Sequence, residues 1–230
     1  MTTDITSKQT NRQNAIYILV GILVFGSIWG LFEVALGGGL RAADFPYRSG
    51  LLIGIGIALM GIALAIHKKP AMLIGIGLVA VLVKLLAVPI LHISVMCEAN
   101  SCIAVFTEAV AMSLVAFVLM GEMSKSVHAR MGSGALAAII ASVGFYFIGM
   151  QVAPCNYLLS FSPGGFIVTE GLIWAAFSAI LLPLGYLAGM KLEAKTFPLL
   201  IKKMPLYYAT TVATIVICWG VSAIAIASGL

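Results

Sequence analysis

The chain has 230 residues, of which 62% are hydrophobic and only 9% are charged. Soluble globular proteins carry about 25% charged residues, so this composition excludes an ordinary water-soluble domain. Apolar stretches of roughly 20 residues recur through the sequence, and each can span the roughly 30 Å hydrocarbon core of a bilayer as a helix. The short alternating segments of a membrane β-barrel are missing. The sequence therefore predicts an all-α integral membrane protein.

The predicted elements are separated by short connections, so we expect a single bundle. Residues 1–14 are polar and lack the order of a cleavable signal, and we expect them to remain as a cytoplasmic N-terminal segment. Seven predicted membrane spans follow, at residues 15–38, 50–66, 71–94, 102–121, 133–153, 164–190 and 206–229.

The positions of the basic residues predict the orientation of these spans. If the N-terminus is cytoplasmic, ten Lys and Arg residues fall on the inner side: Lys8, Arg12, Lys68, Lys69, Lys125, Arg130, Lys191, Lys195, Lys202 and Lys203. Only Arg41 and Arg48 fall outside, and Lys84 lies within the third span. This is the positive-inside bias. We therefore expect a cytoplasmic N-terminus and an outer C-terminus in a prokaryotic inner membrane. Topology explains the net charge of +5, and no nucleic-acid partner is expected.

The last part of the chain differs from the bundle that we expect over residues 15–190. Residues 191–205 alternate Lys with apolar residues and contain Pro198 and Pro205, which predicts an amphipathic segment on the cytoplasmic face. Residues 206–230 then form an additional C-terminal span, so the fold is a six-helix core plus one helix.

Small residues in the first three spans predict close contacts between helices. Gly26 and Gly30 have the GxxxG spacing, and further Gly and Ala residues crowd the second and third spans: Gly54, Gly56, Ala58, Gly61, Ala65, Gly75, Gly77 and Ala80. Small side chains let helix backbones approach closely in lipid. The close contacts are either within this chain or with another membrane subunit.

Four charged residues lie inside the spans, where a charge is costly and marks a functional candidate: Glu33, Lys84, Glu108 and Glu170. Counting helical rise from the span ends puts the three carboxylates roughly 7–9 Å below the outer boundary. The same count puts Lys84 roughly 16 Å deep, where it can pair with one of the acids.

Two tryptophans accompany these acids. Trp29 precedes Glu33 by four residues and Trp174 follows Glu170 by four, so each indole is expected one turn deeper on the same helix face as its acid. This arrangement predicts an outward-facing pocket, acidic at its mouth and aromatic below, for a compact organic ligand. The alternative is that the acids only pair with Lys84 or with hydroxyl groups to fix the bundle.

The predicted outer loops contribute cysteines and amides. Cys97 and Cys102 flank Asn100 between the third and fourth spans, His92 lies one turn upstream, and Cys155 and Asn156 lie in the next outer loop. Outside the cell these thiols can form a disulfide, Cys97–Cys102 or one of the two with Cys155. A metal site at Cys97, Cys102 and His92, thiol exchange and free thiols stay open as alternatives.

No enzyme signature is present. The chain lacks a Walker loop, HExxH, GxSxG and paired histidines for haem, so no enzyme activity is expected. No cofactor is predicted beyond the metal alternative and a metal-containing ligand.

The chain resembles the substrate-binding S components of energy-coupling factor transporters for vitamins and metals. The resemblance lies in a small apolar bundle and in the string Trp29-Gly30-x-x-Glu33 before a short outer loop, and it covers residues 15–191. It implies high-affinity binding of a vitamin or metal ion from outside and inward release on a membrane partner driven by ATPases. It also implies docking through Gly26 and Gly30. The seventh span departs from the six that are usual in that family.

We therefore expect an uptake protein for a vitamin-like or metal-containing nutrient. Its expected site residues are Glu33, Glu108, Glu170, Lys84, Trp29, Trp174, Asn100 and Asn156. The alternatives are a membrane subunit of a redox or thiol-exchange complex, and a secondary transporter that uses Glu108 or Glu170 as a proton relay.

Overall fold

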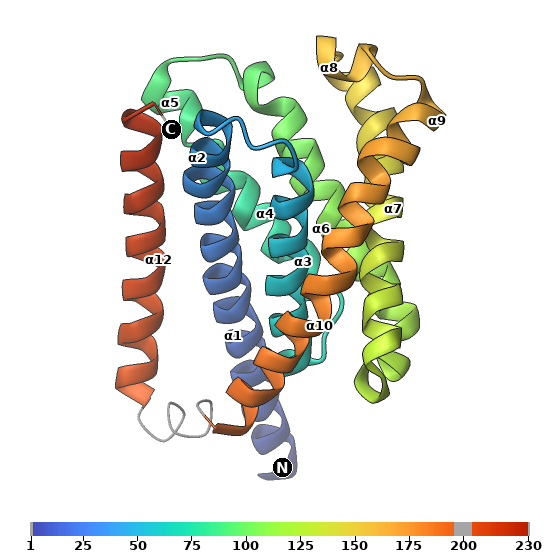
Figure 1. Ribbon diagram of the computed structural model, residues 1–230. Helices are drawn as coiled ribbons and strands as arrows, with labels where there is room; N and C mark the ends of the chain where they lie inside the picture. Colours follow the sequence, from blue (N-terminus) through green and yellow to red (C-terminus); the bar gives the residue numbers. More distant parts are fainter. Residues whose placement is uncertain (1, 196–203, 230) are drawn as a thin grey trace.

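The protein is an all-helical bundle whose long axis is that of its membrane spans (Figure 1). The computed structural model describes the backbone of residues 2–195 and 204–229 and the side chains of residues 15–194 and 204–229. Seven helices in this described part are long and apolar enough to cross a membrane: Ala15–Ala42, Arg48–His67, Met72–Leu91, Val95–Lys125, Val127–Val152, Pro163–Ala194 and Met204–Ala227. The seven predicted spans of a multi-pass membrane protein are therefore confirmed. The two termini lie at opposite ends of the bundle, as an odd number of spans requires.

The spans are built from helical segments that do not all match one span each. In chain order they are α1 (Thr2–Leu31), η1 (Phe32–Leu36), α2 (Gly37–Ala42), α3 (Arg48–His67), α4 (Met72–Lys84), α5 (Ala87–Leu91), α6 (Val95–Lys125), α7 (Val127–Val152), α8 (Asn156–Leu159), α9 (Pro163–Phe166), η2 (Ile167–Gly171), α10 (Leu172–Lys195) and α12 (Met204–Ala227). The segments η1 and η2 are single π-helical turns within the first and sixth spans.

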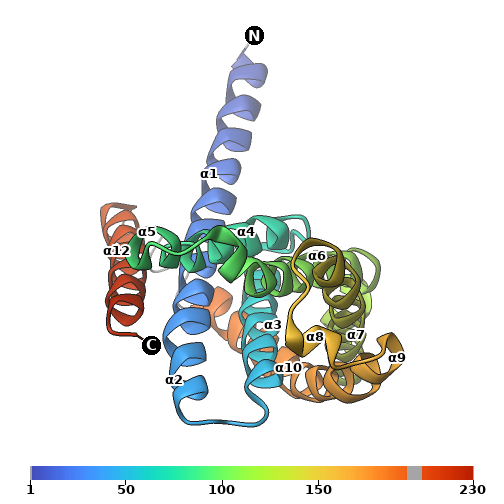
Figure 2. The ribbon, with the colours of Figure 1, turned by 90° about the horizontal axis from the view of Figure 1, so that it is seen from above.

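Six spans form a closed ring, and the seventh lies outside it (Figure 2). Around the ring the order is α1, α4, α6, α7, α10, α3 and back to α1, and α3 also contacts α6. Helix α12 packs on α1, η1 and α5. The indole N–H of Trp219 donates to Ser27 Oγ at 2.9 Å and fixes α12 to α1. This arrangement agrees with the expected six-helix core plus one helix.

Glycines allow the closest helix contacts in the ring. A Cβ at Gly185 of α10 would overlap the backbone oxygen of Ala58 on α3, and one at Gly189 would lie 2.6 Å from the backbone oxygen of Ile62. The glycines of the first span behave likewise, because Cβ atoms at Gly26 and Gly30 would each lie 2.5 Å from a valine of α4. Both are buried. The expectation that Gly26 and Gly30 form a docking surface for another subunit is therefore wrong, because α4 of the same chain covers both glycines.

Two predicted boundaries are also corrected. The fourth span begins at Val95 and not near residue 102, because Ser94 caps the helix by accepting a hydrogen bond from the Met96 N–H at 3.3 Å. The third span is interrupted after Lys84, and its last residues form the short helix α5.

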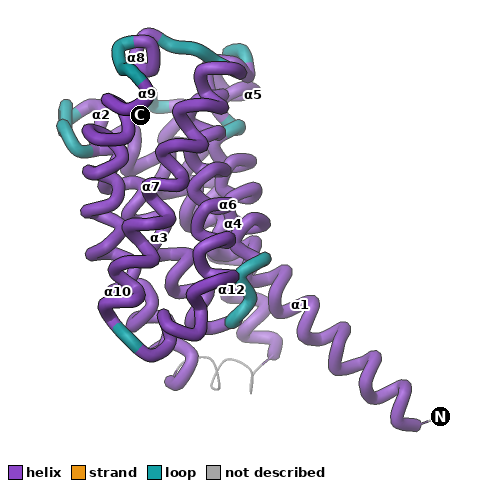
Figure 3. Tube along the Cα trace, turned by 90° about the vertical axis from the view of Figure 1, so that its right-hand side faces the viewer, coloured by secondary structure: helices purple, strands orange, loops and turns teal. Residues whose placement is uncertain are grey.

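The two terminal segments are described only in part. The backbone of the expected N-terminal segment continues α1, which extends away from the other helices (Figure 3). Of the expected interfacial segment, residues 191–195 complete α10, Met204 and Pro205 begin α12, and residues 196–203 lie outside the described part.

We predict that Gly185→Ala destabilises the bundle, because the added methyl group must push α10 away from α3. The expected loss in free energy of unfolding is about 1–3 kcal/mol. Gly220→Ala in α12 is the matched control, because a Cβ there meets nothing within 4 Å and alanine favours the helix. Thermal denaturation in detergent measures both. Equal melting temperatures for the two variants would contradict this packing.

Candidate functional site

A buried ion pair joins the first and third spans. Lys84 Nζ lies 2.9 Å from Glu33 Oε2, and the two side chains are only 9% and 8% exposed. The turn η1 carries Glu33, and α4 ends at Lys84. In a low-dielectric interior each charge depends on the other. From the sequence, Lys84 could pair with any one of three acids, and in the structure its partner is Glu33.

Lys84 lies at the height of the acid and not deeper. The depth counted from sequence assumed a continuous helix to the end of the third span. The chain instead turns at Leu85 and Leu86, and α5 lies against α12. These residues therefore do not add the rise of a straight helix, and the count from the end of the span overestimates the depth of Lys84.

A second acid lies beside this ion pair with its own polar atom unsatisfied. Glu108 is 1% exposed, and its Oε1 has no hydrogen-bond partner among the described residues. The same holds for the indole N–H of Trp29, which is fully buried. A Cβ at Gly56 of α3 would overlap Glu108 Oε1 and lie 2.7 Å from Trp29 Nε1, so both groups lie against one glycine. A buried acceptor and a buried donor thus stand next to one another unpaired.

We call Glu33, Lys84, Glu108 and Trp29 the charged cluster. Both members of the ion pair lie within electrostatic range of Glu108. Since Lys84 neutralises Glu33, the cluster contains no second cation for an ionised Glu108. Leaving a buried polar group unpaired costs roughly 1–3 kcal/mol, and proteins usually avoid it. The charged cluster is therefore suited to take up a further hydrogen-bonding or charged species.

Glu170 belongs to a different group. Its Oε2 accepts a hydrogen bond from Ser49 Oγ at 3.0 Å, and Tyr157 of α8 lies close to the same carboxylate. Helix α3 separates the two groups, because Gly56 faces the charged cluster whereas Gly50 faces Ile173 of α10. The three acids do not converge on one site, because Glu108 lies against Gly56 whereas Glu170 bonds to Ser49, which is roughly 10 Å of helical rise away along α3. Helical rise gives depth in the bilayer and does not give direction around the bundle.

Trp174 is part of an aromatic group. Its ring centroid lies 5.7 Å from that of Phe145 and 5.8 Å from that of Phe166. Its indole N–H, like that of Trp29, has no hydrogen-bond partner within the described residues. The structure therefore places Trp29 and Trp174 in separate surroundings.

The predicted amides lie near the upper end. Asn100 Nδ2 donates to the Ala153 backbone oxygen at 2.8 Å and ties α6 to the end of α7. Asn156 is exposed at the start of α8. Neither amide contacts the charged cluster through a described hydrogen bond.

All four cysteines are free thiols in this structure. Cys97 and Cys102 are five residues apart in α6, which separates their Cα atoms by about 8.7 Å in a regular helix. A disulfide needs a separation below roughly 7 Å, so α6 is incompatible with the Cys97–Cys102 bridge. The expected loop is helical, which corrects that pairing. A bridge from either residue to Cys155 stays a prediction.

The predicted metal ligands do not form a cluster. His92 is exposed and ends α5 in a left-handed conformation, with φ of 53°. No group of three or more His, Cys, Asp or Glu residues in the described part of the chain could hold a metal ion. Cys102 is half-buried within electrostatic range of Lys84 and Glu33, so it lies beside the charged cluster.

Sequence reasoning missed several residues of these groups. Gly56 makes room for the Glu108 carboxylate and the Trp29 indole, and Ser49 and Tyr157 surround Glu170. The π turns that carry Glu33 and Glu170 were also missed, although such turns are frequent at functional sites. The many glycines of the second span were the one sequence feature that pointed to a close approach there. Their spacing did not show that Gly56 is the glycine that faces a carboxylate.

Comparison of the chain with protein-family models, curated proteins and solved structures finds no match. The proposals below therefore rest on the residues and their geometry.

We predict that Lys84→Met lowers the free energy of unfolding by about 3–5 kcal/mol, because it leaves the Glu33 carboxylate buried without a counter-charge. Adding Glu33→Gln to Lys84→Met should recover most of that loss. Lys125→Met is the control, since Lys125 pairs with Glu122 at the same 2.9 Å but is 69% exposed. Its expected cost is below about 1 kcal/mol. Equal losses for Lys84→Met and Lys125→Met in chemical denaturation would contradict the role of burial.

We also predict that Tyr157 resists ionisation. Partial burial, and then the charge and hydrogen bonding of Glu170, raise the pKa of Tyr157. The folded protein thus holds this proton above pH ~10, where a free tyrosine loses it, and the stabilisation is lost as the pH rises further. Glu170→Gln should lower the pKa of Tyr157. The measurement is the alkaline phenolate absorbance of each protein minus that of its Tyr157→Phe counterpart. An unchanged titration in Glu170→Gln would refute the contact.

Proposed function

We propose that the chain is a membrane uptake protein that binds a small nutrient at the charged cluster and passes it inward with an energy-coupling partner. The upper end of the bundle is then the outer side, and the N-terminus is cytoplasmic, in a prokaryotic inner membrane. One observation carries the proposal: Glu108 Oε1 and the Trp29 indole N–H are buried, lie against the same glycine and have no hydrogen-bond partner among the described residues.

The two unpaired groups specify the chemistry of the ligand. Glu108 Oε1 requires a hydrogen-bond donor, and the Trp29 N–H requires an acceptor. A ligand that satisfies both presents a donor and an acceptor side by side, as the edge of a vitamin-like heterocycle does. The flat Trp29 ring adds an apolar surface for such a ligand. Binding then removes the cost of two unsatisfied groups, which favours a ligand with this edge over one without it.

The charged cluster is buried, so the ligand enters only when helices separate. Two cavities in the described part lie elsewhere: one of about 160 Å³ between α6 and α7, and one of about 210 Å³ at the lower end. The structure then corresponds to a closed form. The π turn η1 loosens the backbone next to Glu33, at the level where the first and third spans must part. The partner of the S-component type would supply the energy for inward release.

A second candidate is proton-coupled transport, and one observation favours it. Glu108 is a buried acid of a membrane span, and the nearby Lys84 pairs with Glu33 instead; such acids act as proton carriers in membrane transporters. A proton needs no cavity. For the thiol-exchange alternative, no contact among the described cysteines supplies support.

We predict that Glu108→Gln weakens ligand binding roughly tenfold to a hundredfold, because an amide replaces the carboxyl group that accepts the ligand's hydrogen bond while the side-chain size is kept. Glu122→Gln, on an exposed part of the same helix, is the matched control. Equilibrium dialysis of the purified protein against a panel of radiolabelled water-soluble vitamins measures this.

The uptake proposal fails if no vitamin of the panel binds, or if the one that binds is held equally by both variants. Proteoliposomes then distinguish the second candidate. Uptake of the solute that follows an imposed proton gradient in the absence of ATP, and that Glu108→Gln abolishes, would favour proton coupling.

A further inference from the structure

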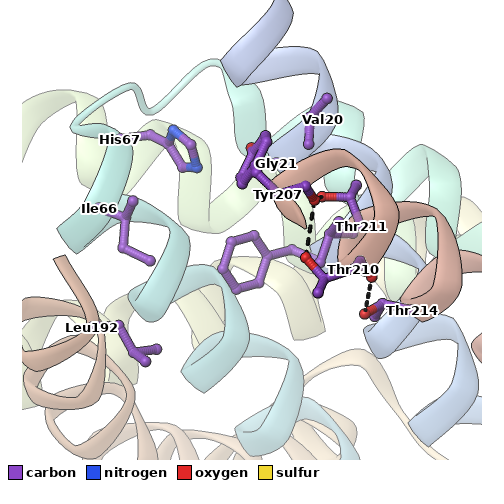
Figure 4. Close-up of a pocket in the computed structure, with 11 residues that line it drawn as sticks. Val20, Gly21, Ile66, His67, Leu192, Tyr207, Thr210, Thr211 and Thr214 are labelled. Carbon is purple, nitrogen blue, oxygen red and sulfur yellow. Dashed lines mark hydrogen bonds between the residues drawn. The ribbon is translucent and has the colours of Figure 1, made fainter. Parts of the chain in front are cut away.

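A cavity of about 210 Å³ lies where α3 and α10 end and α12 begins, at the lower end of the bundle in Figure 1, and Figure 4 shows it in close-up. On α1 its lining ends at Phe25, four residues before Trp29 of the charged cluster. It is lined by α1, α3, α10 and α12 and is open on one side. Its lining residues are Val20, Gly21, Val24, Phe25, Ile66, His67, Leu192, Tyr207, Thr210, Thr211 and Thr214. The cavity lies between the seventh helix and the six-helix ring. Helix α12 packs on α1, η1 and α5, and the cavity separates it from α3 and α10.

The wall of this cavity on α12 is less polar than its residue types suggest. Thr210, Thr211 and Thr214 all donate their hydroxyl hydrogens to backbone oxygens of their own helix, at 2.7 to 2.9 Å. Their hydrogens are thus not available to a ligand, and their methyl groups join the aliphatic lining. The walls therefore suit a hydrocarbon chain better than a polar solute.

The rim of the cavity is basic. His67 in the lining is followed directly by Lys68 and Lys69, and Leu192 is preceded by Lys191. All three lysines are exposed. Lys68 pairs with Glu193 at 3.0 Å, whereas Lys69 and Lys191, each within two residues of a lining residue along the chain, have no acid among their described ion pairs. Lysines at this level of a membrane protein attract the phosphate groups of anionic lipids.

We propose that this cavity binds one anionic phospholipid, with an acyl chain between α12 and the ring and its phosphate near Lys69 and Lys191. Charge complementarity at the rim and a hydrocarbon-like interior together select this occupant. The lipid would fill the seam and hold α12 on the bundle. The site is independent of the proposed nutrient site, because it shares no residue with the charged cluster.

The test is lipid retention by the full chain purified in detergent. The protein is incubated with phosphatidylglycerol or with phosphatidylcholine of the same acyl chains, freed of excess lipid, and weighed by native mass spectrometry. We expect one retained phosphatidylglycerol and several-fold less phosphatidylcholine. Thr211→Phe fills the cavity and should abolish retention. Val212→Phe, the same replacement at the next residue, which is 59% exposed, should not.

The role of the two lysines is tested with substitutions of exposed side chains, which do not alter the lining of the cavity. Lys69→Gln combined with Lys191→Gln should reduce phosphatidylglycerol retention to the phosphatidylcholine level, whereas Lys125→Gln should leave it unchanged. The proposal is overturned if the two lipids are retained equally by the wild type, if neither is retained, or if retention survives both Thr211→Phe and the double lysine variant.

Discussion

The ion pair between Glu33 and Lys84 is the constraint on which the upper half of the bundle depends. Two charges with less than a tenth of their side chains exposed can persist in a membrane only together. The pair fixes the first span against the third at the point where α4 ends, and the chain beyond it turns away to form α5. Because Lys84 is committed to Glu33, Glu108 is left without a cation among the described residues. The functional proposal follows from that imbalance.

The ring of helices explains why one acid joins this pair and another does not. Helix α3 occupies the space between the two groups, and glycines on its two sides admit different neighbours: Gly56 admits Glu108 and Trp29, and Gly50 admits α10. Glu170 is satisfied locally by Ser49, so it does not require a ligand. Glu108 Oε1 and the Trp29 N–H have no such partner among the described residues. The lower cavity differs from the charged cluster, because the threonine hydroxyl groups that line it on α12 already donate hydrogen bonds to their own helix.

Sequence reasoning reached the features that composition and helical rise control. Apolar runs of roughly 20 residues specify the seven spans, because each is long enough to cross the bilayer as a helix. Counting residues did not show that Glu108 lies against Gly56 and Glu170 against Ser49, at different levels of α3. The direction of each side chain around the bundle depends on tertiary packing, so the separation of Glu170 and the approach of Gly56 to Glu108 could not be derived. The helical start at Ser94 placed Cys97 and Cys102 on one helix, where a loop was expected. The π turns have no sequence signature that would have located them.

The central claim is that the charged cluster holds a small polar ligand between Glu108 and Trp29. The most direct measurement is small-molecule mass spectrometry of what is released when wild-type protein, purified from its own membrane, is denatured. The account predicts one water-soluble compound in near-equimolar amount, with adjacent hydrogen-bond donor and acceptor groups, and its absence from protein carrying a leucine in place of Gly56. A release that contains only lipid, or a compound retained equally by that variant, would contradict it.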